Sequence, residues 1–141
     1  MSAASPKPPL AAQPDPSSLA MGELTQELNR LQRSIRLAIQ AHLGKLAGHS
    51  LGSLKENREL AKSIHELLES HGLRVQCVEC GHPAILRVSP RSGSPAGAFV
   101  FDHSIQGRRT FHGGKGVLPE LRLVAKPPRK KAGKVSLAGG G

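Results

Sequence analysis

Apolar positions in the first half of the chain follow the spacing of a long helix. From Ser17 onward they recur three or four residues apart, which places them on one helical face of about eight turns. Ser17 or Ser18 can cap the start of this helix, and Gly48 lies just past its end. The positions that form the face are Leu24, Leu28, Leu31, Ile35, Ala38 or Ile39, His42 or Leu43, and Leu46.

A second helix is expected after a short linker. Ser53 and Glu56 have the spacing of a capping box, and Gly72 can end the helix. Its apolar face consists of Leu54, Ala61, Ile64 and Leu68. Because the linker is short, we expect residues 17–72 to form an antiparallel helical hairpin with a leucine seam. The same seam is an alternative interface for a homodimer, since two helices alone leave apolar surface uncovered.

The pattern changes at Leu73 to short β-branched or aromatic runs separated by Gly, Pro and Ser. This pattern is typical of a small antiparallel sheet over residues 73–125. The runs are LRVQC, PAILRVS, GAFVFDHS, RRTFH and PELRLVA, and PRSGSPAG is expected to form a loop between the second and third. The predicted fold class is therefore α+β.

Both ends of the chain lack this periodicity. Residues 1–16 contain five prolines and predict a disordered leader. Residues 126–141 combine prolines, lysines, an arginine and a glycine tail, and predict a basic disordered tail.

Composition limits the core and the cellular setting. Of the 141 residues, 38% are hydrophobic and 2% aromatic, and the three phenylalanines, Phe99, Phe101 and Phe111, all fall in the predicted sheet. No run approaches the roughly 20 apolar residues that span a bilayer, and no signal peptide is recognisable. We expect a cytoplasmic protein without a membrane segment, in which the two cysteines are not a structural disulfide.

The positive charge belongs to the second half of the chain. Residues 1–72 hold eight Lys and Arg against seven acids, whereas residues 73–141 hold twelve against three. A basic surface attracts polyanions through counterion release, so nucleic acid is the leading class of partner, and a solvated basic tail is the alternative. The predicted contact residues are Arg74, Arg87, Arg91, Arg108, Arg109, Lys115, Lys126, Arg129, Lys130 and Lys131.

A sheet of this size needs a further stabilising element, and four residues have the chemistry of a zinc site. Cys77 and Cys80 are separated by two residues, His103 follows after 22 more, and His112 after another eight. Zinc favours four tetrahedral nitrogen or sulfur ligands. Gly81 permits the positive φ that the curl around two thiolates needs.

The stretch QCVECGHP resembles the knuckle of zinc-ribbon proteins, and the resemblance covers residues 73–125 at most. It implies a structural zinc ion and a module that docks on nucleic acid or protein. The usual second Cys-x2-Cys is absent, which leaves the third and fourth ligands open. A redox dithiol would need a helix N-terminus after the motif, but a turn and strand follow here.

The two histidines can share an ion only if the turn between them is short. With Gln106 and Gly107 at a two-residue tip, Ile105 pairs with Arg108, and His103 and His112 lie on one face. A three-residue tip would turn His112 to the other face. His82 lies too close to Cys80 to join the same tetrahedron, and is expected to donate a hydrogen bond or contact phosphate.

We therefore expect a non-enzymatic zinc module that binds nucleic acid, with a protein-interaction adaptor or dimer as the alternative. Arg108 and Arg109 at the hairpin tip are the leading contacts, because a tip can approach phosphates. FVFDHSIQG also resembles part of the HNH nuclease pattern, which implies His103 as a general base beside Asp102. No asparagine follows His103, and a zinc-bound His103 could not serve as the base.

Overall fold

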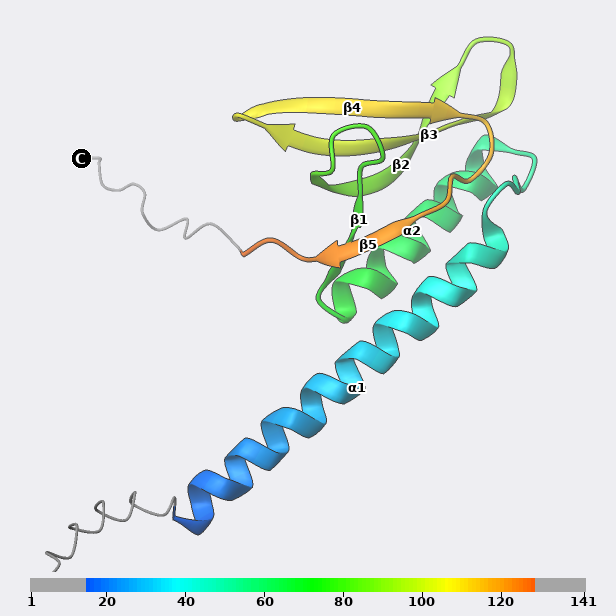
Figure 1. Ribbon diagram of the computed structural model, residues 1–141. Helices are drawn as coiled ribbons and strands as arrows, with labels where there is room; N and C mark the ends of the chain where they lie inside the picture. The colour runs from blue at the N-terminus through cyan, green and yellow to red at the C-terminus, as the bar shows by residue number, and fades with distance from the viewer. Residues whose placement is uncertain (1–14, 129–141) are drawn as a thin grey trace, which may run out of the picture. The chain divides into compact units, whose positions relative to one another are not determined.

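The computed structural model describes residues 15–128, which form two helices and a five-stranded antiparallel sheet (Figure 1). The α+β prediction is confirmed. Of the predicted disordered leader (1–16) and tail (126–141), residues 1–14 and 129–141 lie outside the described residues, whereas Pro16 begins a helix and the Lys126 amide donates to the Gly72 carbonyl at 2.9 Å. The chain divides into two units, one ending at Ala38 within the first helix and one beginning at Ile39. The elements are α1 (Pro16–Leu46), α2 (Leu54–Ser70), β1 (Leu73–Gln76), β2 (Pro83–Arg91), β3 (Ser94–Ile105), β4 (Arg108–Lys115) and β5 (Arg122–Ala125).

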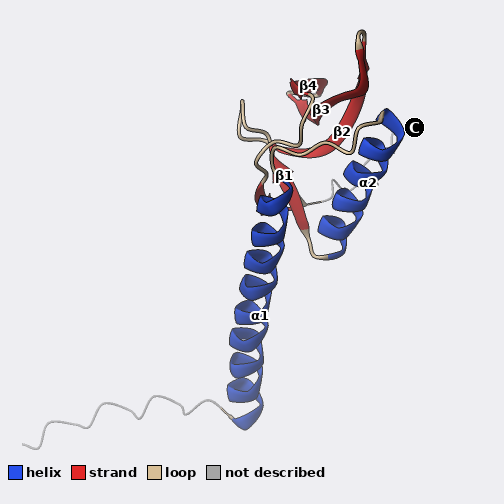
Figure 2. Ribbon diagram, turned by 90° about the vertical axis from the view of Figure 1, so that its right-hand side faces the viewer, coloured by secondary structure: helices blue, strands red, loops and turns tan. Residues whose placement is uncertain are grey.

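The strands lie in the order β4-β3-β2-β1-β5. The stretch 90–97 was expected to be a loop, and this is wrong: β2 and β3 run to Arg91 and from Ser94, so only two residues form the turn. Backbone pairing continues past the last apolar position, and the β2–β3 hairpin therefore extends beyond its pairing with β4 (Figure 2). Gly93 supplies the positive φ of 77° that this tight turn requires.

Asp15 caps the start of α1. Its carboxylate accepts hydrogen bonds from the Ser18 amide at 2.7 Å and the Ser17 hydroxyl at 2.9 Å, and these bonds lower its pKa. The expected cap at Ser17 or Ser18 is wrong, because Pro16 takes the first helical position, where its missing N–H costs nothing.

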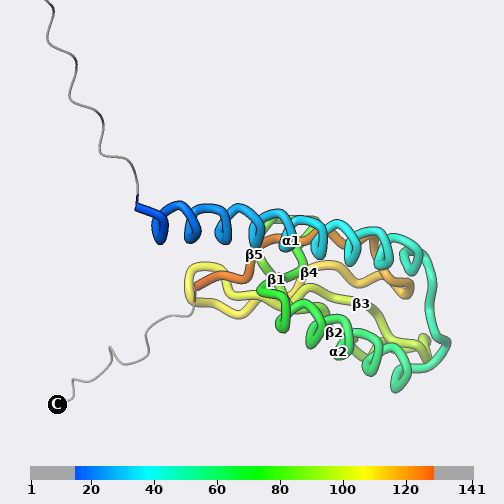
Figure 3. Tube along the Cα trace, turned by 90° about the horizontal axis from the view of Figure 1, so that it is seen from below, coloured from blue at the N-terminus to red at the C-terminus, as the bar shows by residue number. Residues whose placement is uncertain are grey.

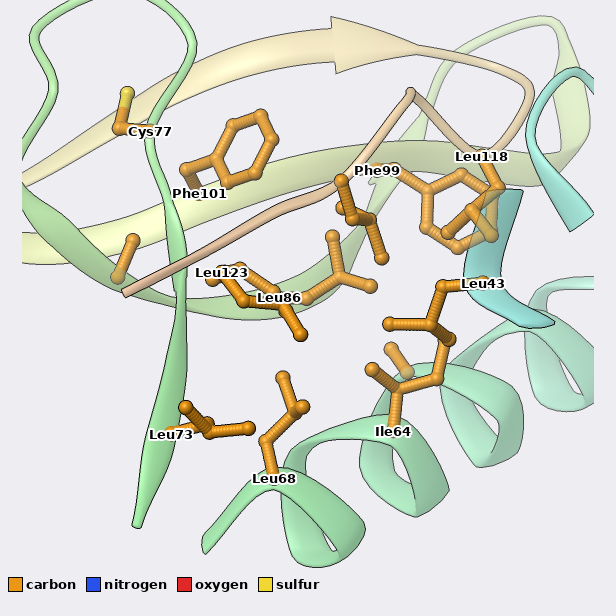
Figure 4. Packing of buried hydrophobic residues seen from close by; sticks show 14 of the residues in the cluster. Leu43, Ile64, Leu68, Leu73, Cys77, Leu86, Phe99, Phe101, Leu118 and Leu123 are labelled. Carbon is orange, nitrogen blue, oxygen red and sulfur yellow. The ribbon is translucent and has the colours of Figure 1, made fainter. Parts of the chain in front are cut away.

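The apolar face of α2 packs on the sheet rather than on a helical seam. Ser53 caps this helix as predicted, accepting from the Glu56 amide at 3.1 Å. Ala61, Ile64 and Leu68 are buried with strand residues, and α2 runs alongside β2 (Figures 3 and 4). The predicted leucine seam between the helices is wrong because the sheet covers this face of α2.

The last turns of α1 contribute to the same core. Leu43 is buried with Ile64 and Phe99, and Ile39 packs against the cluster. The earlier positions of the predicted seam are not buried in this core: Leu24, Leu28, Leu31 and Ile35 are 38–48% exposed.

Asn57 is the fully buried polar residue of α2. Its Oδ1 accepts from the Leu51 amide at 2.9 Å, and its Nδ2 donates to Ser50 Oγ and to the Ala96 carbonyl, both at 3.1 Å. These bonds join the linker between the helices, the first turns of α2 and the start of β3. Buried polar groups are retained in proteins when they are satisfied in this way.

Candidate metal centre

The loop between β1 and β2 forms a closed knuckle around the two cysteines. The Gly81 amide donates to the Cys77 carbonyl at 2.9 Å, and the Cys77 amide donates to the His82 carbonyl at 2.9 Å. Gly81 has the predicted positive φ, at 77°. The backbone amides of Cys80 and Glu79 are directed at the Cys77 sulfur. This loop therefore presents both sulfur atoms to the same side.

The β3–β4 hairpin has the short turn that the zinc hypothesis requires. Ile105 pairs with Arg108, and His103 pairs with Thr110, so the predicted register is confirmed. Gln106 and Gly107 have φ values of 52° and 77°, as in a two-residue type I′ turn. Because side chains alternate along a strand, His112 lies on the same face as His103.

The knuckle and the hairpin bring four ligand atoms together. The donor atoms of Cys77, Cys80, His103 and His112 all lie within 4.8 Å of one another. Cys77 Sγ is 3.3 Å from His112 Nδ1, and Cys80 Sγ is 3.1 Å from His103 Nε2. Tetrahedral zinc, with bonds of about 2.3 Å to sulfur and about 2.0 Å to nitrogen, would separate such atoms by about 3.5 Å. The four residues are thus positioned to hold a metal ion.

The orientation of His103 is fixed by the backbone of β4. Its Nδ1 lies 2.7 Å from the Thr110 carbonyl, to which it donates a hydrogen bond. This bond leaves the lone pair on Nε2, the atom nearest Cys80. Metal-binding histidines commonly use the second ring nitrogen in this way.

His82 lies beside the cluster rather than within it. Its Nδ1 is 3.2 Å from Cys80 Sγ, the side chain is exposed, and its ring meets that of His103 edge to face. It can therefore donate a hydrogen bond to the sulfur, one of the two roles expected for it.

The two thiols differ in burial, since Cys77 is buried and Cys80 is only partly buried. Cys77 is 1% exposed, and this burial raises the pKa of its thiol above the ordinary value, although the amides of Cys80 and Glu79 partly oppose the shift. Glu79 also ties the knuckle to β4, because its carboxylate accepts from the Gly113 amide at 2.6 Å.

Four of the residues predicted to contact nucleic acid form ion pairs with carboxylates of the same chain. Asp102 accepts from Arg87 and, at 2.8 Å, from Arg109, while Glu69 accepts from Arg74 at 3.1 Å and Lys126 at 3.0 Å. Arg91 donates to the Gly114 carbonyl, whereas Arg108 and Lys115 are exposed. Arg129, Lys130 and Lys131 lie outside the described residues.

Sequence reasoning assigned no structural role to Asp102. The residue is 6% exposed, and its two arginine partners hold the pKa of its carboxyl group below the usual range, with Arg109 the larger cause. Asp102 and His103 project to opposite faces of β3, since they are consecutive strand residues. The signal that could have found the Arg109 partner is the side-chain alternation along the predicted β3–β4 hairpin, which places Asp102 and Arg109 on one face.

Comparison with protein-family models, curated proteins and solved structures finds no match to this chain. Neither helix within residues 15–128 is long and apolar enough to cross a membrane.

Proposed function

We propose that the four-residue cluster binds zinc as a structural ion. Two cysteines and two histidines are a donor set that zinc prefers, and here side chains supply all four ligands of a closed tetrahedral site. The resemblance of the knuckle to zinc ribbons supports this proposal, with His103 and His112 in place of the second cysteine pair.

The position of the cluster also supports a structural role. Cys77 and Phe101 belong to the hydrophobic core (Figure 4). His112 pairs with Phe101 across the β3–β4 ladder. The ligands come from two segments of the chain, the β1–β2 loop and the β3–β4 hairpin. An ion between them would fasten the knuckle to the hairpin and stabilise the folded state, because the ion binds the assembled site and the unfolded chain has no such site.

Cobalt(II) tests this assignment, because it replaces zinc in such sites and its thiolate complexes absorb visible light. We expect metal-free protein to take up cobalt with a cysteine-to-metal absorption band, and zinc to displace it. Cys80→Ser should weaken the band strongly. His82→Asn is the matched control, because His82 contacts the same sulfur from outside the cluster, and it should leave the band nearly unchanged. Folded protein that binds neither ion would overturn the proposal.

We also propose that the sheet face opposite the core binds nucleic acid. Strand alternation places Arg74, Arg87, Arg109 and Arg122 on this face. The side chains of Arg87 and Arg109 remain 50% and 64% exposed despite their contact with Asp102. Carboxylates that fix arginines in extended positions lower the entropy lost when those arginines contact phosphate.

The observation that carries this second proposal is an exposed aromatic ring among these arginines. Phe111 is 51% exposed on the same face, with Arg109 at 5.0 Å from its ring centre. Arg109 also lines a depression of about 390 Å³, together with Arg74, His82 and Pro127, among others. Aromatic rings next to cations are the common surface for single-stranded nucleic acid, where bases stack and phosphates pair.

Fluorescence anisotropy with labelled single-stranded DNA and RNA tests this face. We expect binding that weakens steeply with added salt, and a loss of about five-fold or more for Phe111→Ala or Arg109→Gln. Arg33→Gln and Val117→Ala are matched controls, since each makes a comparable change elsewhere on the surface. No binding at low salt, or equal losses in the controls, would refute the interface.

A further inference from the structure

The first unit carries an apolar stripe on the exposed surface of α1. Met21, Leu24, Leu28, Leu31 and Ile35 are 59%, 48%, 48%, 46% and 38% exposed. We propose that this stripe binds the same stripe of a second copy of the chain, forming a parallel two-stranded coiled coil over Met21–Ala38. The proposal is independent of the zinc and nucleic-acid assignments.

The spacing of the stripe selects a helical partner. From Met21 to Ala38 the steps alternate between three and four residues. Their mean of about 3.5 is the heptad period of a left-handed coiled coil, and is shorter than the 3.6 of a straight helix. A helix packed on a sheet needs no such strict alternation, so the pattern fits a second helix best.

The residue types fit a parallel dimer. Met21, Leu28 and Ile35 occupy the first core position of successive heptads, and Leu24, Leu31 and Ala38 occupy the second. Leucine at the second position and isoleucine at the first are typical of two parallel strands, and Leu24, Leu31 and Ile35 follow this preference, whereas Met21, Leu28 and Ala38 select no oligomeric state.

The residues that flank the stripe do not oppose pairing. Ala20, Thr25, Gln32 and Ser34 are uncharged, and the flanking Glu27 forms an ion pair with Arg30 of its own helix. The remaining charges of this segment, Glu23, Arg33 and Arg36, lie on the other side of the helix by their heptad positions. Like charges therefore do not meet across the proposed interface.

The stripe supplies part of the area that a stable dimer needs. Burying a whole aliphatic side chain removes roughly 60–120 Å² of apolar surface. Ten half-exposed side chains, five from each copy, therefore supply about 300–600 Å² of apolar area. Specific interfaces bury about 1,000–1,200 Å² or more in total, so the uncharged flanking side chains have to contribute the remainder.

The stripe ends where the second unit begins. Ile39 packs against the core and Leu43 is 5% exposed within it, so neither is available to a partner. The predicted seam from Leu24 to Leu46 is thus divided between two roles: its first part is exposed for dimerisation, and its last part is used for the core.

Light scattering after size-exclusion chromatography tests the dimer in the full chain. We expect a mass of twice 14.9 kDa at micromolar concentrations. Leu31→Glu places a charge in the stripe and should raise the dissociation constant at least 100-fold, giving a monomer. Leu37→Glu is the matched control, because Leu37 is 62% exposed on the same helix but off the stripe, and it should remain dimeric.

Three outcomes would overturn the dimer: a wild-type monomer at every concentration, a dimeric Leu31→Glu variant, or equal disruption by Leu37→Glu. Leu24→Cys tests the orientation, because only parallel helices place this residue opposite its own copy. Mild oxidation of the zinc-loaded variant should then link the two chains, while the wild-type protein stays unlinked. A dimeric variant that fails to form the cross-link would overturn the parallel arrangement.

Discussion

Replacing Asn57 with alanine tests how α2 is joined to the sheet. Asn57 is fully buried and makes three hydrogen bonds, one from the Leu51 amide and two to Ser50 Oγ and the Ala96 carbonyl. Alanine fits the helix but satisfies none of these groups. The change therefore removes the polar link between the helix linker, α2 and β3 without disturbing the metal ligands.

The expected loss follows from the groups left without partners. The Leu51 amide and the Ala96 carbonyl would each lose a partner in a partly buried setting, at about 1–3 kcal/mol per group. The Ser50 hydroxyl can rotate towards water and adds little, and alanine recovers about 0.5 kcal/mol through its helix propensity. We expect the free energy of unfolding to fall by about 1.5–5.5 kcal/mol.

Urea denaturation, followed by circular dichroism in buffer with excess zinc, measures this difference. Asn29→Ala is the control, since Asn29 is exposed on α1, and it should change the unfolding free energy by less than about 1 kcal/mol. Ser50→Ala removes one of the three bonds and should cost about 0.5–1.5 kcal/mol. If Asn57→Ala is as stable as the wild-type protein, the assigned attachment of α2 is wrong.

Three further predictions concern the same unit. Glu69→Gln should destabilise the protein at pH 7, because Lys126 and Arg74 lower the pKa of Glu69 in the folded protein. This stabilisation is present above the unfolded pKa of 4.5 and is lost as the pH falls through the folded pKa. The urea midpoints of the variant and the wild-type protein should therefore converge in acid. Gly97→Ala should lower the free energy of unfolding by about 2–5 kcal/mol in the same assay, because Gly97 has a φ of 72° and a Cβ there would lie 2.7 Å from Leu54. The control Gly93→Ala should lower it by only about 1–2 kcal/mol, because Gly93 has a similar φ of 77° but open space around it. Phe101→Ala should lower the unfolding free energy by about 3–5 kcal/mol, because Phe101 is 1% exposed. It should also weaken metal binding, measured by chelator competition, because Phe101 pairs with the metal-ligand candidate His112. Unchanged metal affinity would contradict this coupling between the core and the cluster.

Features set by local spacing could be predicted from the sequence. The capping box at Ser53, the two-residue turn after Ile105 and the positive φ of Gly81 each depend on a few neighbouring residues, and the structure has all three. The ligand set followed from them, because a fixed turn determines which histidines share a face.

Features set by a distant partner could not be predicted in this way. The apolar face of α2 indicated that something covers it, but a helix and a sheet produce the same helical spacing. Asp102 lies 15 residues from Arg87, and Glu69 lies 57 residues from Lys126, so the strand order had to be known before either ion pair could be recognised. Asp15 was missed as a cap because the serines that follow it have the same preference.

Elemental analysis of protein purified without chelator tests the zinc site most directly. We expect about one zinc ion per chain, and loss of that zinc when either Cys77 or His112 is replaced by alanine. His82→Asn should retain it. A folded wild-type protein that contains no stoichiometric metal, and that takes up none when zinc is supplied, would contradict the assignment of these four residues as a zinc site.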